Sequence, residues 1–173
     1  MDKNVNQEAI MAIGTAGLTA ALAVKRIIES NKNIVPSKVL ITGATGGVGI
    51  ISIIIFKHLG AQVTALTTSS KFTKKLEDLG VDEIINPINF VKSAKQNLGL
   101  AKWNAAIDVT GGEILSSVIK TIMPNGSISV IGNVQSTSFN TNVLPFILRG
   151  ISLNGINAEL QNNHIRNELI KKI

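Results

Sequence analysis

The chain has 173 residues, of which 45% are hydrophobic and 16% charged, and its formal net charge is +6 at pH 7. This composition predicts a globular protein with a buried core and excludes a disordered chain. The absence of cysteine excludes disulfides and thiolate metal sites. No segment is typical of a signal peptide or a membrane span, so we expect a cytoplasmic protein that does not bind membranes.

The positive charge does not indicate nucleic-acid binding. The basic residues are scattered, and the tightest group is Lys71, Lys74 and Lys75. Aromatic residues, which accompany basic patches in many nucleic-acid-binding proteins, make up only 3% of the chain. A solvated surface that also attracts small anionic ligands explains the charge better.

Apolar periodicity and glycine or proline punctuation predict alternating helices and strands. The first helix spans residues 8–30, with Gly14 and Gly17 interrupting its early part. Further helices are expected at 48–59, 72–79, 90–98 and 113–123. Strands are expected at 39–42, 61–68, 82–87, 104–110, 127–133 and 151–158, with a turn at 124–126 and a loop before the last strand.

This alternation predicts the fold class. Strands that alternate with helices form a parallel sheet covered on both faces. We therefore expect an α/β protein with a doubly wound six-stranded parallel sheet of the Rossmann type. Residues 1–35 would form a junction helix that leads into a cofactor-binding domain at 36–173, and both ends look like the ends of something larger.

The stretch "ATGGVG", from Ala44 to Gly49, matches the dinucleotide fingerprint G-x-G-x-x-G with alanine in first place. It follows a predicted strand and opens a predicted helix, which is the context that makes the fingerprint informative. Gly46 would let the backbone approach a pyrophosphate, and Gly49 would let the helix pack closely on the sheet. The alternative is a tight strand-to-helix turn whose glycines serve packing alone.

The end of the second predicted strand bears on which nucleotide would bind. An acidic residue there accepts the ribose hydroxyls of NAD, but this sequence has "TTSSK", from Thr67 to Lys71. Hydroxyl groups and a lysine suit a 2′-phosphate, so the sequence favours NADP over NAD. The alternative is a polar loop in which a serine or threonine caps the next helix.

A second pattern covers the same glycines. Thr42 to Gly49 fits T-G-x-x-x-G-x-G, which is typical of short-chain dehydrogenases. Those enzymes use a catalytic tyrosine four residues before a lysine. The chain contains no tyrosine, so short-chain catalysis within it is excluded.

Four segments together carry a family resemblance: "IGTAGLTAALAV" (Ile13–Val24), "ITGATGGVG" (Ile41–Gly49), "AIDVTGG" (Ala106–Gly112) and "PFILRGISLNGI" (Pro145–Ile156). Their order and spacing resemble the zinc-independent quinone-oxidoreductase branch of the medium-chain dehydrogenase/reductase superfamily. Within that branch the "PFILR" element resembles the acryloyl-CoA reductase group most. The resemblance covers nearly the whole chain.

The resemblance implies NADPH-dependent reduction of an activated carbon–carbon double bond, in a small-molecule substrate such as an enoyl-CoA thioester or a quinone, without a metal. It implies that Gly46, Gly47, Val48 and Gly49 hold the pyrophosphate, and that Thr67, Thr68 and Ser69 hold the adenosine ribose and its 2′-phosphate. It also places Gly132, Asn133, Ile147 and Ala158 near the nicotinamide, and Thr15 near the cofactor at the domain junction. The catalytic residues stay unknown.

Family members also have an N-terminal GroES-like domain that holds the substrate, and nothing in this sequence corresponds to it. We therefore expect a cofactor domain with little or no activity alone, which forms a homo-oligomer or associates with a catalytic domain. The alternative is a stand-alone NADP(H)-binding or sensing module without turnover.

Four further polar residues are candidates for a function. His58 and His164 have no partner at ligand spacing and are expected to be ordinary surface residues. Asp108 ends the fourth predicted strand, where ordering of the Thr110–Gly111 loop is favoured over catalysis. Arg149 could contact another domain or a cofactor phosphate, and the sequence does not choose between them.

Overall fold

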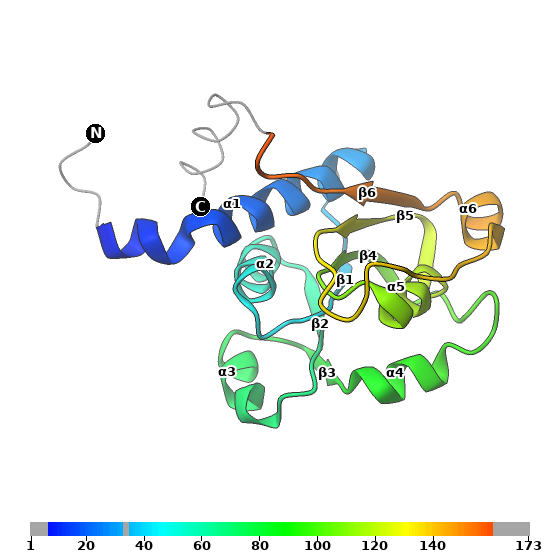
Figure 1. Cartoon of the computed structure of the whole chain (residues 1–173), viewed down its shortest axis with the longest axis horizontal. Coiled ribbons are helices and arrows are strands. Elements are labelled where there is room, and N and C mark those ends of the chain that lie inside the picture. Colours follow the sequence, from blue (N-terminus) through cyan, green and yellow to red (C-terminus); the bar gives the residue numbers. More distant parts are fainter. Residues whose placement is uncertain (1–6, 33–34, 161–173) are drawn as a thin grey trace.

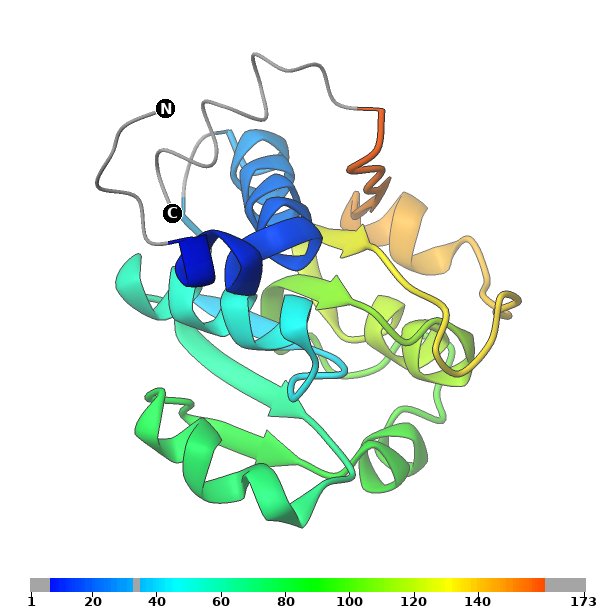
Figure 2. The same ribbon diagram turned by 60° about the vertical axis from the view of Figure 1, so that its left-hand side comes forward.

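A six-stranded parallel sheet forms the centre of the protein. The computed structural model describes residues 7–32 and 35–160. The strands are β1 (Lys38–Ile41), β2 (Gln62–Leu66), β3 (Glu83–Ile85), β4 (Trp103–Asp108), β5 (Ile122–Val130) and β6 (Ser152–Gly155). Their order is β3-β2-β1-β4-β5-β6, and every neighbouring pair is parallel (Figure 2). The predicted fold class is confirmed.

Helices cover both faces of the sheet (Figure 1). One face packs against α1 (Gln7–Ser30), α2 (Gly47–His58) and α3 (Thr73–Asp78), with a short 3-10 helix, η1 (Ser70–Phe72), before α3. The other face packs against α4 (Pro87–Ser93), α5 (Gly112–Ile119) and α6 (Leu144–Arg149). This two-sided covering is why the central strands are rich in buried apolar residues.

The side chains of β1 show how one strand serves two cores. Val39 and Ile41 point into the α1–α2 side, whereas Leu40 points into the α4–α5 side, and all three are fully buried. Successive side chains of a strand alternate between faces, so β1, buried on both sides, is apolar at three successive positions.

The first helix bends where the sequence predicts a break. Gly14 has φ +36° and ψ −145°, which lie outside the helical region, and the chain changes direction there. Gly17 stays within the helix and is buried. Within the described residues, no helix combines the length and the apolar character needed to cross a membrane.

Several element boundaries differ from the prediction, among them the following three. Pro87 begins α4, three residues earlier than expected, because proline fits the first helical position and the Asn86 side chain accepts a hydrogen bond from the Ile88 amide at 2.9 Å. The strand β5 begins at Ile122, within the predicted helix, and it contains the predicted turn as an irregularity at which Asn125 has φ +60°. The segment 144–149, expected as part of a loop, forms α6.

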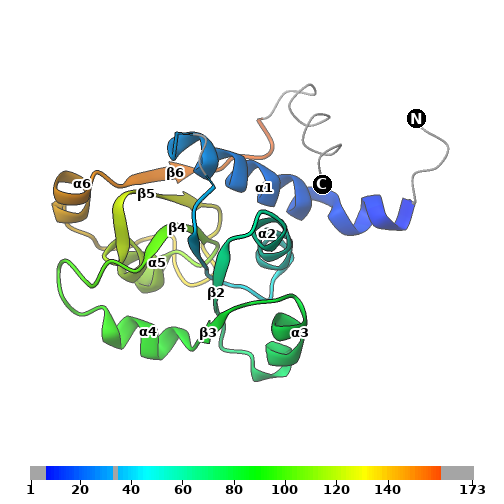
Figure 3. The same ribbon diagram turned by 180° about the vertical axis from the view of Figure 1, so that it is seen from behind.

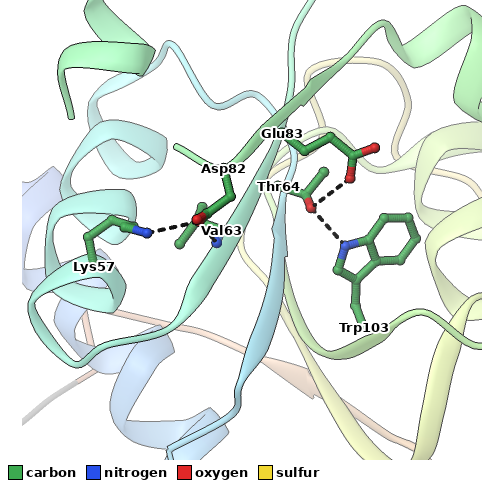
Figure 4. Close-up of polar contacts among 6 residues, drawn as sticks. All are labelled: Lys57, Val63, Thr64, Asp82, Glu83 and Trp103. Atoms are coloured by element: carbon green, nitrogen blue, oxygen red, sulfur yellow. Dashed lines mark hydrogen bonds and ion pairs between the residues drawn. The ribbon is translucent and has the colours of Figure 1, made fainter. Parts of the chain in front are cut away.

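Polar contacts join β2, β3 and β4 on the two sides of the sheet (Figure 4). Asp82 accepts hydrogen bonds from Lys57 Nζ at 2.8 Å and from the Val63 amide at 2.7 Å. Trp103 is buried, donates from Nε1 to Thr64 Oγ1 at 3.0 Å and packs edge-on against Phe90. Trp103 therefore serves the packing of the sheet against α4.

Candidate functional site

The carboxyl edge of the sheet gathers most of the predicted site residues. The loops after β1, β2, β5 and β6 are each tied by a backbone hydrogen bond to the neighbouring strand. The bonds run from Ala44 N to Leu66 O (3.2 Å), from Thr67 N to Ile85 O (3.2 Å), from Ile131 N to Asp108 O (2.8 Å) and from Ile156 N to Val130 O (3.0 Å). In doubly wound sheets this edge is where ligands bind.

The loop between β1 and α2 exposes backbone at the start of a helix. Gly46 is the N-cap residue of α2, and no side chain caps the helix there. Gly46 and Gly47 are both exposed. A Cβ atom on Gly46 would have only the Gly43 carbonyl oxygen nearby, at 3.4 Å, so the space in front of this residue is open. Helix N-termini of this kind attract anions.

The other glycines of the loop serve packing. A Cβ atom on Gly49 would lie 2.6 Å from the Gly43 oxygen and 2.8 Å from Ala44 Cα, so the first turn of α2 lies directly on the loop backbone. Gly43 has φ +56°, and a Cβ atom there would lie 2.3 Å from Val109 Cγ2. Our site prediction did not include Gly43. The T-G at the start of the short-chain pattern was the signal that could have identified it.

The loop after β2 lies next to the glycine loop. Thr67 follows the strand directly, and its Oγ1 accepts a hydrogen bond from the Ser69 amide at 3.0 Å. Thr68 is exposed, and Ser69 is the N-cap residue of η1 but makes no capping bond with its side chain. The segment from Thr67 to Lys71 contains no acidic side chain.

A buried carboxylate lies between the loops after β1 and β4. Asp108 is fully buried and accepts hydrogen bonds from Thr42 Oγ1 (2.7 Å), Thr110 Oγ1 (2.8 Å) and the Gly111 amide (2.8 Å). Burial raises the pKa of Asp108 above its ordinary value of 3.8, although the three hydrogen bonds favour the charged form. These contacts confirm that Asp108 orders the Thr110–Gly111 loop.

The loop after β5 folds back onto the turn between β4 and α5. The Gln135 amide donates to Thr110 O at 2.8 Å, and the Gln135 side chain accepts from the Ile114 amide at 3.1 Å. Gly132 follows β5, and a Cβ atom on it would lie 2.5 Å from Val109 O. A pocket of about 310 Å³ opens here; Gly111, Gly132, Asn133, Ser136 and Phe139 are among the residues that line it.

Two further predicted residues lie along α1. Thr15 is exposed, and its neighbour Ala16 lies against the glycine loop, where a Cβ atom on Gly47 would be 3.2 Å from Ala16 Cβ. Ala158 follows β6 and packs against the α1 cluster formed by Leu18, Ala21 and Leu22. Ala158 therefore lies against α1, and Thr15 adjoins the residue through which α1 meets the glycine loop.

Ile147 is not brought to this edge. It lies on α6, which leads into the amino end of β6 and is located away from α2 and α3 (Figure 3). Arg149 on the same helix donates to Lys120 O (2.9 Å), Ile122 O (3.0 Å) and Gly99 O (2.5 Å), which lie near the amino ends of β4 and β5. Arg149 thus binds three backbone carbonyls of this chain.

The remaining candidates add no site. His58 is exposed at the last position of α2, and His164 lies outside the described residues. Within 7–32 and 35–160, no three histidine, aspartate or glutamate side chains are grouped so that they could hold a metal ion.

Comparison with known proteins identifies relatives over most of the chain. A family model described as "Zinc-binding dehydrogenase" matches residues 47–172. The putative quinone oxidoreductase YhfP of Bacillus subtilis is 35% identical over 158 residues, which cover 91% of this chain and 48% of that protein. The acrylyl-CoA reductase AcuI of Ruegeria pomeroyi is 34% identical over 151 residues, which cover 87% of this chain and 46% of that protein.

Solved structures of similar proteins have the same fold over nearly the whole chain. The structure of E. coli YHDH with bound NADPH superposes with a TM-score of 0.91 at 27% identity and covers 99% of this chain and 53% of that one. The structure of Bacillus subtilis yhfP with bound NAD gives a TM-score of 0.91 at 34% identity and covers 98% of this chain and 52% of that one. The chain therefore spans about half the length of the proteins it matches.

Proposed function

The chain belongs to the zinc-binding dehydrogenase family, and from this premise we propose that it binds NADP(H) at the carboxyl edge of its sheet. We further propose that it is the cofactor-binding part of a reductase for activated carbon–carbon double bonds. The observation that carries the proposal is the open glycine loop at Gly46. Exposed backbone at an uncapped helix start, with no side chain in front of it, suits a pyrophosphate.

The other site residues take their roles from position along this edge. Gly46, Gly47 and the amide of Val48 would face the pyrophosphate, while Gly49 keeps α2 close enough for them to do so. The pocket beside Gly132 and Asn133 would receive the nicotinamide half. Thr15 and Ala158 would flank it from α1 and from the end of β6. The place near the nicotinamide that the resemblance implies for Ile147 stays a prediction.

The loop after β2 supports NADP over NAD. A carboxylate at this position would repel a 2′-phosphate, whereas Thr67, Thr68 and Ser69 offer hydroxyl groups and Lys71 follows. The relatives include one structure with NADPH and one with NAD, so the family alone does not decide the nucleotide. The choice rests on the composition of this loop.

The reaction class is proposed from the relatives named as acrylyl-CoA reductase and quinone oxidoreductase. When bound, NADPH supplies the hydride. This chain's residues would bind it, fix the orientation of its pyrophosphate and present one face of the nicotinamide pocket. The residues do not fit a zinc ion, because the chain has no cysteine and the described residues contain no ligand cluster. The proposal therefore places no metal ion on this chain.

We also propose that the partner of this chain is a second copy, which pairs along β6. This strand is an edge of the sheet, so one side of its backbone has no neighbouring strand among the described residues. The segment 150–158 carries no charged residue and no proline, the features that usually protect an edge. On α6, which precedes β6, Val143, Ile147 and Leu148 expose 65%, 68% and 63% of their surface.

Cofactor titration followed by an activity assay tests the proposal. The purified chain should bind NADPH more tightly than NADH by calorimetry, and failure to bind either nucleotide would overturn it. Activity is measured as NADPH oxidation with acryloyl-CoA, first with the chain alone and then with the separately expressed substrate domain of a relative. We expect little turnover alone, because hydride transfer needs both reacting carbons held in place. Binding without turnover in either setting would indicate a binding module.

A further inference from the structure

The buried carboxylate of Asp108 joins two loops that come from different strands. Its Oδ1 accepts hydrogen bonds from Thr42 and Thr110, and its Oδ2 accepts from the Gly111 amide. Thr42 directly precedes the glycine loop, and its hydroxyl also accepts from the Val109 amide at 3.1 Å. The donors are two hydroxyls and a backbone amide, so the arrangement depends on the acceptor capacity of one side chain.

The Gly111 end of this arrangement forms one wall of the pocket. Gly111 has φ +67°, and a Cβ atom there would lie 2.3 Å from Ser136 O, with which the segment forms a parallel bridge. Gly111 and Ser136 both line the pocket beside Gly132. A shift of Gly111 therefore moves the pocket wall directly.

Backbone bonds hold both ends, since the Gln135 amide donates to Thr110 O and Gly111 forms a bridge with Ser136. The ends differ in what Asp108 contacts: the backbone amide of Gly111 at one end, but only the side chain of Thr42 at the glycine-loop end. The Thr42 amide donates to Ile107 O at 3.0 Å, and the Ala44 amide donates to Leu66 O at 3.2 Å, so the backbone of this loop is tied to β4 and β2. Loss of the Asp108 carboxylate removes a side-chain contact from Thr42 but leaves these backbone bonds. The two ends should thus respond differently.

We propose that Asp108 is a positioning residue that holds Gly111 and the adjoining pocket wall in the shape that receives the nicotinamide half of the cofactor, with little effect on the adenosine half. This inference rests on the proposed binding of NADP(H) at the carboxyl edge. It assigns Asp108 no contact with the cofactor and no proton transfer. It predicts that loss of the Asp108 carboxylate weakens binding of a ligand that includes the nicotinamide half. Binding of a ligand that consists of the adenosine half alone should change little.

The test compares NADPH with adenosine 2′,5′-bisphosphate, which lacks the nicotinamide half. In Asp108→Ala the affinity for NADPH should fall about tenfold or more, whereas the affinity for the bisphosphate should stay within about twofold. Asp108→Asn keeps the shape and one acceptor oxygen and should recover most of the loss. The fluorescence of bound NADPH reports the nicotinamide environment, and we expect it to change in Asp108→Ala at saturation.

Trp103→Phe is the control for general destabilisation, because it removes a buried hydrogen bond at the other end of the same strand. It should leave the ratio of the two affinities unchanged. Equal losses for both ligands in Asp108→Ala, or no recovery in Asp108→Asn, would overturn the inference. Failure of the unaltered chain to bind either ligand would instead overturn the proposed function.

If Asp108→Ala does not fold, Thr110→Val provides the second variant, because it removes one donor to the carboxylate and keeps the side-chain shape. A smaller loss confined to NADPH is expected. Unchanged NADPH affinity in that variant would contradict the positioning role.

Discussion

Gly49 lies against the backbone of Gly43: a Cβ atom on Gly49 would be 2.6 Å from the Gly43 carbonyl oxygen, and the Ala44 backbone would be within 2.9 Å. No rotamer change relieves a contact with backbone atoms, so Gly49→Ala must move α2 away from the loop. We expect this variant to lose about 1–3 kcal/mol of unfolding free energy in a urea titration. Gly155→Ala, where the added Cβ meets nothing within 4 Å, should change it by less than about 0.5 kcal/mol.

Gly46 should show the opposite behaviour. Its φ of −79° suits any residue, and an added side chain would point into open space in front of α2. Gly46→Val is expected to keep the urea midpoint close to that of the unaltered chain but to abolish NADPH binding by calorimetry, because the side chain occupies the proposed pyrophosphate position. Undiminished affinity would mean that the glycines serve packing alone.

Much of the fold could be predicted because its signals are local in the sequence. Continuous apolar runs such as Val39–Ile41 indicate strands buried on both faces, and glycines such as Gly60 and Gly80 mark helix ends locally. Each of these signals can be recognised from a few consecutive residues, without knowledge of contacts distant in the sequence. The prediction went wrong where two local signals competed. Pro87 ends a strand and begins a helix equally well, and Pro124–Gly126 could follow a helix or interrupt a strand.

In the candidate site too, residues with local signals could be predicted, whereas residues whose role depends on distant contacts could not. Residues 46–49 and 67–69 could be placed at one edge because each segment directly follows a predicted strand. Gly43 and Arg149 could not be assigned, because their roles depend on contacts distant in sequence: Val109 for Gly43, and the carbonyls of Gly99, Lys120 and Ile122 for Arg149. Ile147 was predicted near the nicotinamide from a family resemblance alone. Its position on α6, apart from the glycine loop within this chain, has no signal in the local sequence.

Asp82 predicts a pH dependence of stability. Burial acts to raise its pKa, but the hydrogen bonds from Lys57 and the Val63 amide outweigh burial, and the pKa lies below its ordinary value of 3.8. A carboxyl group with a lowered folded-state pKa stabilises the protein above the unfolded value, and this contribution is lost as the pH falls through the folded value. The side chain is 43% exposed, so solvent screening limits the contribution to about 0.5–1 kcal/mol.

Asp82→Asn should therefore be less stable than the unaltered chain at neutral pH, with the difference shrinking as the pH falls below 3.8. Urea titrations across this range measure it. Asp78→Asn is the matched control, because Asp78 forms only an exposed pair with Lys74 at 3.8 Å. A difference for Asp82→Asn that does not change with pH would contradict the account of its pKa.

The loop after β2 offers the sharpest test of nucleotide choice. Ser69 is the N-cap residue of η1, and aspartate is an equally favourable N-cap, so Ser69→Asp should fold normally. Its carboxylate would repel a 2′-phosphate but could accept hydrogen bonds from the free ribose hydroxyls of NADH. We expect the affinity for NADPH to fall about tenfold or more while the affinity for NADH is kept or rises, as measured by fluorescence titration with both nucleotides. Ser69→Asn has nearly the same shape without the charge and should change the NADPH affinity much less. If Ser69→Asp and Ser69→Asn lower the affinities for both nucleotides alike, this loop does not bind the 2′-phosphate.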